Sequence, residues 1–259
     1  MKKGILVFMA CFVWLLLMFN ANSSHAVSVS NSTAIIYWNT LYISGIEIEW
    51  ISKGSGCWAE AKDNWDYDYS YDWKDEWVDT SASASVTNAT ANAWTTDLEL
   101  YGGGWARSTG PYEAKSDAAT GRWGEFKALE SGDLTISVDY YLTQDLSTQY
   151  LGEWVEGEVS AFLYLHNKTK GDWAEDRGDL YNSVYDGDSG HWEDSGTFTV
   201  TLWFDEGDEG EFGADVWNDA NVYSPVPVPS TMLLLGSGLA GLVVIGRRFR
   251  KYKKEPISC

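Results

Sequence analysis

Cysteine is scarce in this sequence. The 259 residues include three cysteines: Cys11 in an apolar N-terminal run, Cys57, and Cys259 at the last position. The long central part of the chain therefore keeps only Cys57, which cannot form an intramolecular disulfide. The fold has to rest on packing, and we expect Cys57 to be a small buried residue.

Residues typical of catalytic sites are also few. Apart from His25 near the N-terminus, the histidines are His166 and His191. The chain contains no His-Glu-x-x-His or Gly-x-Ser-x-Gly motif and no Cys-His arrangement that indicates a nucleophile and its base. A glycosidase needs only two carboxylates, but acidic residues are so common here that no pair stands out. We therefore expect a protein without enzymatic activity.

Basic residues are scarce where acidic residues abound. Residues 27–224 hold ten of the 18 Lys and Arg and 37 of the 38 Asp and Glu, a net charge of −27. Such a field repels nucleic acids and anionic membranes and attracts divalent cations, basic proteins or cationic polymers. Nucleic-acid binding is thereby excluded, and the simplest role of the charge is to keep a secreted protein soluble.

Long apolar runs are confined to the two ends of the chain. At the N-terminus two lysines precede the apolar run 4–19, which is followed by Ser24, His25 and Ala26. This order of charged, apolar and small residues predicts a secretory signal peptide over residues 1–26, cleaved after Ala26.

Proline is rare, but three of the five prolines alternate with valine within residues 225–230. Proline fixes an extended backbone, so these residues cannot begin a continuous helix. The uncharged residues 231–246 would form about 24 Å of helix, a little short of a hydrocarbon core of about 30 Å. We expect a transmembrane helix there, with the basic cluster 247–254 on the cytoplasmic side, residues 27–224 outside, and a short extension at 255–259.

This tail resembles the PEP-CTERM sorting signal of bacterial envelope proteins. The residues that carry the resemblance are Val226, Pro227, Val228, Pro229 and Ser230, together with Arg247 and Arg248. Val228 departs from the family pattern, which usually has Glu between the prolines. The resemblance implies export across the inner membrane, recognition by an integral-membrane exosortase that cuts near the prolines, and transient anchoring before delivery to the cell surface or medium. It also implies association with exopolysaccharide producers; an anchor that is never cleaved is the alternative.

Between the two ends the sequence predicts β-structure throughout. Residues 133–142 alternate apolar and polar side chains, with Leu134, Ile136, Val138 and Tyr140 on one face. No segment between the ends shows a sustained apolar period of 3.6 residues. The expected fold is all-β, an antiparallel β-sandwich flanked by the signal helix and the transmembrane helix. The final two strands, 197–204 and 211–223, are expected to form a hairpin.

Small and glycine-rich segments give further local predictions. Residues 81–94 alternate small and polar side chains and are expected to form a strand with one face close under another sheet. Gly157 marks a candidate β-bulge. Clusters of Gly and Asp at 102–104, 186–190 and 205–210 predict turns between the strands.

The stretch Trp65-Asp-Tyr-Asp-Tyr-Ser-Tyr-Asp-Trp73 has the most distinctive pattern. In a strand its aromatic residues share one face and its acidic residues the other. The simplest interpretation is a half-buried strand with the aromatic face in the core. An exposed aromatic face could instead stack on sugar rings through Trp65, Tyr69 and Trp73, and the acidic face could bind calcium. The spacing does not fit an EF-hand, because Tyr71 stands where the loop needs glycine.

Other residues suit a ligand less specifically. Calcium prefers several oxygen ligands, and carboxylates gather on the glycine-bearing turns; the candidates are Asp186, Asp188, Asp205 and Asp208. Such turns are also ordinary hairpin tips. Tryptophans in polar, glycine-bearing surroundings are candidates for exposed platforms; these are Trp105, Trp123, Trp173 and Trp192. No other cofactor is expected.

Taken together, these features predict a secreted, non-catalytic component of the envelope or extracellular matrix. Its expected partners are the secretion machinery, the exosortase, the membrane through the C-terminal helix, and exopolysaccharide. A lectin-like carbohydrate-binding module and a plain single-pass surface protein are the alternatives. Tryptophans exposed on a sheet surface would favour the lectin-like module.

Overall fold

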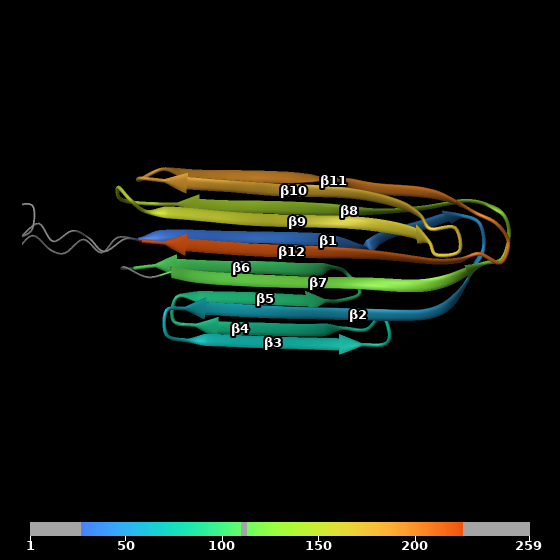
Figure 1. Ribbon diagram of the computed structural model, residues 1–259, viewed down its shortest axis with the longest axis horizontal. Coiled ribbons are helices and arrows are strands. Elements are labelled where there is room, and N and C mark those ends of the chain that lie inside the picture. The colour runs from blue at the N-terminus through green and yellow to red at the C-terminus, as the bar shows by residue number, and fades with distance from the viewer. Residues whose placement is uncertain (1–26, 110–112, 225–259) are drawn as a thin grey trace, which may run out of the picture. The chain divides into compact units, whose positions relative to one another are not determined.

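The computed structural model describes residues 27–109 and 113–224, which form twelve β-strands in two layers (Figure 1). The strands are β1 (Ser28–Gly45), β2 (Ile48–Asp63), β3 (Tyr67–Lys74), β4 (Thr80–Val86), β5 (Ala89–Thr95), β6 (Leu100–Ser108), β7 (Glu113–Ala128), β8 (Gly132–Ser147), β9 (Trp154–Asn167), β10 (Asp172–Tyr185), β11 (Ser189–Phe204) and β12 (Glu209–Tyr223). Within these ranges there is no helix long and apolar enough to cross a membrane. The predicted signal peptide with Ser24 and Ala26, and the predicted tail from residue 225 onward, lie outside the described residues.

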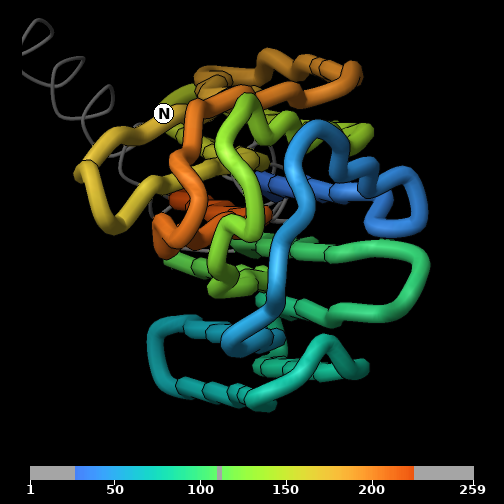
Figure 2. Tube along the Cα trace, turned by 90° about the vertical axis from the view of Figure 1, so that its right-hand side faces the viewer, coloured from blue at the N-terminus to red at the C-terminus, as the bar shows by residue number. Residues whose placement is uncertain are grey.

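The strands form two six-stranded antiparallel sheets. The first sheet has the order β11-β8-β1-β6-β5-β4, and the second has the order β10-β9-β12-β7-β2-β3. Several connections between consecutive strands pass from one sheet to the other, as the view along the strands shows (Figure 2). The predicted antiparallel β-sandwich is confirmed for the described residues.

The predicted hairpin between the last two strands is wrong. β11 is the edge strand of the first sheet and pairs with β8, whereas β12 lies inside the second sheet between β7 and β9. The turn at residues 205–208 therefore crosses the sandwich. Phe204 before the turn and Phe212 after it are both fully buried. Because they enter the core from opposite sheets, the crossing closes this end of the core.

Three local predictions need correction. Residues 81–94 contain two strands, since a turn at residues 87–88 separates β4 from β5. The three glycines at 102–104 lie inside β6, and β9 pairs in unbroken register through Gly157, so no bulge occurs there. The turns predicted at 186–190 and 205–210 are confirmed, because they separate β10 from β11 and β11 from β12.

The core divides into a large-residue cluster and an alanine-rich cluster. The large-residue cluster contains Leu134, Ile136, Val138 and Phe126, so the predicted inward face of β8 is confirmed. The alanine-rich cluster lies mainly between β2 and the β4–β5 hairpin and includes Cys57, which is buried as predicted. Alanine faces let the two sheets approach closely, because little side-chain volume separates them.

Candidate functional site

The aromatic side chains of β3 face solvent. Trp65, which precedes the strand, is 85% exposed, and Trp73 is 56% exposed. The other exposed members of the series are Tyr67, Tyr69 and Tyr71. The interpretation that placed this face in the core is therefore wrong.

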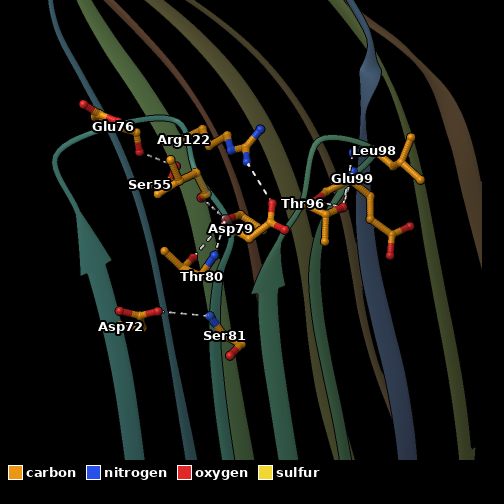
Figure 3. A network of polar contacts seen from close by, with 12 residues as sticks. Ser55, Asp72, Glu76, Asp79, Thr80, Ser81, Thr96, Leu98, Glu99 and Arg122 are labelled. Atoms are coloured by element: carbon orange, nitrogen blue, oxygen red, sulfur yellow. Dashed lines mark hydrogen bonds and ion pairs between the residues drawn. The ribbon is translucent and has the colours of Figure 1, made fainter.

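The acidic face of β3 turns toward the other sheet instead. One carboxylate oxygen of Asp68 accepts a hydrogen bond from the backbone N–H of Ser85 at 2.8 Å. Asp72 accepts one from the N–H of Ser81 at 3.4 Å, as Figure 3 shows. Both donors belong to β4, the edge strand of the first sheet. These contacts occupy N–H groups that an unprotected edge would offer to another chain.

Packing explains why the aromatic residues point outward. The inner side of β2 and β4 is filled by Ala59, Ala61, Ala82 and Ala84, all buried. The narrow space between these alanines cannot hold a row of Tyr and Trp rings. Short acidic side chains fit at its margin, where they meet the β4 backbone and water.

On the outer face of the second sheet, aromatic rings lie across glycines of adjacent strands. The pairs are Trp73 on Gly56, Trp123 on Gly54 and Tyr164 on Gly213. A Cβ atom on Gly56 would lie 2.3 Å from the Trp73 ring, and one on Gly54 would lie 2.1 Å from the Trp123 ring. The bare backbone is therefore required for these rings to lie against the sheet.

These rings surround a pocket of about 470 Å³ on the same face. Its aromatic lining comes from five strands and consists of Trp58, Trp73, Trp123, Phe162, Tyr164 and Trp217. Between the rings lie the small residues Gly56, Ala119 and Gly121. Trp58 packs edge-on against Trp217, with ring centres 5.3 Å apart, and the Trp73 and Trp123 centres are 5.6 Å apart.

Two carboxylates, Asp215 and Glu211, also line the pocket. Asp215 lies over Gly121, because a Cβ atom there would meet its Oδ1 at 1.8 Å. Glu211 accepts a hydrogen bond from the Tyr164 hydroxyl at 2.9 Å. Among the described residues Asp215 has no hydrogen-bond or ion-pair partner. Burial, with a smaller contribution from the Glu211 charge, raises the pKa of Asp215 to about 7.

An acidic row crosses the sheet beside the pocket. Asp117 and Asp219 face each other on β7 and β12, and Lys115 lies 3.1 Å from a carboxylate oxygen of each. Burial and the Asp219 charge raise the pKa of Asp117 to about 7. The ammonium group of Lys115 thus neutralises part of the charge of this row, whereas no Lys, Arg or His lines the pocket.

The sequence-predicted platform residues are divided between the two sheets. Trp123 lines the pocket, and Trp173 lies on the same face, stacked on Tyr164 with ring centres 4.9 Å apart. Trp105 and Trp192 are half-buried residues of the first sheet. Of the three residues predicted to stack on sugars, Trp73 lines the pocket. Tyr69 belongs to the same strand, and Trp65 precedes the first residue of that strand.

Three of the four candidate aspartates of the acidic turns use their carboxylates within the protein. Asp208 accepts hydrogen bonds from Asn167 and from the backbone N–H of Asp205, and Lys170 forms ion pairs with both aspartates. Asp186 accepts a hydrogen bond from the N–H of Gly152, while Asp188 contributes its backbone carbonyl to Thr148. Within the described part of the chain no group of three or more His, Cys, Asp or Glu is arranged to hold a metal ion.

Comparison with known proteins identifies one segment. The model of the PEP-CTERM protein-sorting motif matches residues 225–251. No curated protein matches the chain. Among solved structures, the type II secretin GspD from enteropathogenic Escherichia coli is 7% identical, with 96% of this chain and 83% of that chain covered and a TM-score of 0.13. Aeromonas hydrophila ExeD is 8% identical, with 96% and 59% covered and a TM-score of 0.11.

Neither structural similarity supports an argument about fold or function, because both TM-scores are far below those of related folds. The sorting motif covers the predicted sequence Val226 to Ser230 and continues through the apolar segment to the basic cluster. This chain thus ends in a PEP-CTERM protein-sorting motif, the signal of an exported protein directed to the cell envelope or surface.

Proposed function

We propose that this protein is a non-catalytic glycan-binding module of the cell surface or extracellular matrix, which binds through the outer face of its second sheet. The observation that carries the proposal is the set of aromatic rings that lie across glycines around an open pocket. Exposed apolar surface that is contiguous and bordered by polar residues is typical of interaction sites. Aromatic rings also suit sugars, because their apolar faces pack against C–H groups while hydroxyl groups remain hydrated.

The proposed route to the surface depends on the C-terminal tail. The exosortase would cut near Pro227 and Pro229 while residues 231–246 anchor the chain in the membrane. Replacing both prolines by alanine removes the constraint that keeps this segment extended. We expect the double variant to remain full-length and membrane-bound, whereas the intact mass of the wild-type protein shows loss of the tail. Normal processing of the double variant would contradict this route.

Affinity electrophoresis tests the glycan-binding face. The full-length protein, in a polyoxyethylene detergent, is run in native gels with and without the exopolysaccharide of the host. We expect the polysaccharide to slow the wild-type protein and to have little effect on Trp73→Ala or Tyr69→Ala. The matched control is Trp203→Ala, because Trp203 is 51% exposed but belongs to the first sheet.

Three results would contradict the proposal. One is that the polysaccharide retards the Trp73→Ala variant as much as the wild-type protein. Another is that the Trp203→Ala control loses as much retardation as the Trp73→Ala variant. The third is a wild-type protein that the polysaccharide never retards, which would favour the plain anchored surface protein. Release of short sugars during incubation with the polysaccharide would contradict the non-catalytic role.

A further inference from the structure

We infer that the aromatic pocket binds an organic ammonium group, the protonated amine of an amino sugar within a polysaccharide. The inference deepens the proposed glycan-binding function and rests on it. It names the chemistry that the pocket would select among sugars. The pocket combines aromatic walls with two carboxylates, and its lining contains no Lys, Arg or His.

The walls offer aromatic faces to a cation. Six aromatic residues line a space of about 470 Å³, which is within the range of small-ligand sites. The ring quadrupole attracts an ammonium group placed within about 6 Å of a ring centre, and tryptophan binds it best. Four of the six residues are tryptophans. A neutral sugar would gain the stacking contacts but not this attraction.

The carboxylates supply the opposite charge. Asp215 and Glu211 lie on the same side of β12 and repel each other, and desolvation makes the charged form of Asp215 costly. The only hydrogen bond to either carboxylate among the described residues is the one from the Tyr164 hydroxyl to Glu211. An ammonium group would give Asp215 a charged donor and offset the repulsion between the two acids.

Within the described ranges no cation pairs with Asp215. Lys168, whose charge acts on Glu211, is held by Glu125 at 2.6 Å. The residues that line the pocket include no Lys, Arg or His. Arg177, which lies beyond Phe162 in the same cross-strand row, is engaged by Asp179 at 2.7 Å. This contrasts with the adjacent Asp117–Asp219 pair, which Lys115 neutralises. The pocket therefore holds a carboxylate, Asp215, that has no cation beside it within an aromatic wall.

A metal ion suits the pocket less well than an organic cation. Calcium takes six to eight oxygen ligands, and the polar side chains of the lining are few among the aromatic and small residues. An ammonium group on a carbon skeleton matches both the rings and the carboxylates. The net charge of −27 over residues 27–224 also draws polycations toward the surface.

Three sugar hexamers distinguish the possible ligands: glucosamine hexaose, its fully N-acetylated form, and cellohexaose. Binding is measured by tryptophan fluorescence at pH 7, with the full-length protein in a polyoxyethylene detergent. At this pH glucosamine still carries protonated amines, and Asp215, with a pKa of about 7, is ionised in about half of the free molecules. We expect glucosamine hexaose to bind most tightly. Asp215→Asn should weaken its binding about 10-fold to 100-fold, the effect of losing a charged hydrogen bond, and leave the weak binding of the other two unchanged.

Glu113→Gln is the matched control. It removes one negative charge from the outer face of the same sheet, at an exposed residue of β7 that does not line the pocket and forms no ion pair among the described residues. Its affinity for glucosamine hexaose should stay within about twofold of the wild type.

The outcomes separate this inference from the proposed function. Equal affinity for all three hexamers, with no effect of Asp215→Asn, would overturn the ammonium site and leave glycan binding in place. Equal weakening by Asp215→Asn and Glu113→Gln would reduce the effect to net charge and also overturn the site. If no hexamer binds and the host exopolysaccharide does not retard the protein, both the site and the glycan-binding function fail.

Discussion

Asp215→Asn should make the protein more stable at alkaline pH. The carboxylate has a pKa of about 7 in the folded protein against an ordinary value of 3.8, a difference of about three pH units. Each unit corresponds to about 1.36 kcal/mol, so ionised Asp215 costs the fold up to about 4 kcal/mol. Water that reaches the carboxylate through the open pocket reduces the cost of ionisation. We therefore expect the free energy of unfolding of the variant to be higher by about 2–4 kcal/mol.

Proton binding by Asp215 determines how the free energy of unfolding changes with pH. Between about pH 4 and pH 7 the folded protein keeps a proton on Asp215 that the unfolded chain has lost. The contribution of Asp215 to stability is therefore greatest below pH 4, falls as the pH rises through this window, and is constant above it. The amide in the variant does not ionise. Variant and wild type should differ little at pH 4 and most above pH 7.

Urea unfolding at intervals from pH 4 to pH 9 measures this difference. Other carboxylates titrate in the same range, among them Asp117, whose pKa is also raised to about 7, and their effects cancel in the comparison of variant with wild type. Asp215 pairs with Gly121 of β7 and Phe162 of β9, and the titratable groups that act on it are Glu211 on its own strand and the Tyr164 hydroxyl. A free energy of unfolding that differs by the same amount at every pH would refute the reasoning.

Three further results are expected from the packing. Phe126→Ala should lower the free energy of unfolding by about 3–5 kcal/mol in urea denaturation, because Phe126 is fully buried in the larger cluster; a loss below 1 kcal/mol would contradict that packing. Gly104→Ala should cost about 1–3 kcal/mol, seen as a lower melting temperature, because its Cβ atom would lie 2.3 Å from Oδ1 of Asn218; an unchanged melting temperature would show that this contact relaxes freely. Replacing Asp68 and Asp72 by alanine should increase self-association in sedimentation velocity, because the edge strand β4 loses two acceptors; a variant as monomeric as the wild type would argue against edge protection.

Alternation of apolar and polar residues was sufficient to predict most of the sandwich. In β8 it identified Leu134, Ile136 and Val138 as the inward face, because a strand covered on one side must alternate. It could not assign β11 and β12 to different sheets. A short turn can join partners within one sheet or cross between two, and only the packing of Phe204 and Phe212 around Phe126 decides between them.

Alternation also could not predict which face of β3 points outward. Apolar side chains usually face the core, and that rule placed the Tyr and Trp rings inside. It failed because the space available opposite β3 depends on the alanines of β4. That strand follows β3 directly in the chain but belongs to the other sheet, which alternation within β3 does not reveal. One signal was present in the sequence: Gly54 and Gly56 are spaced two residues apart in a strand rich in aromatic neighbours. Because residues two apart in a strand share a face, this spacing leaves the backbone of that face without side chains, and rings from adjacent strands can lie on it.

The position of β12 has a consequence for the order in which the chain can fold. β12 is the last strand to be synthesised, yet it lies inside the second sheet, paired with β7 on one side and β9 on the other. Until residues 209–223 are available, that sheet exists only as two separate fragments, β9–β10 and β7–β2–β3. A chain interrupted before residue 209 would hence present two long open edges, the kind of surface that aggregates. Completion of the fold thus coincides with the arrival of the sorting motif, which begins two residues after β12 ends.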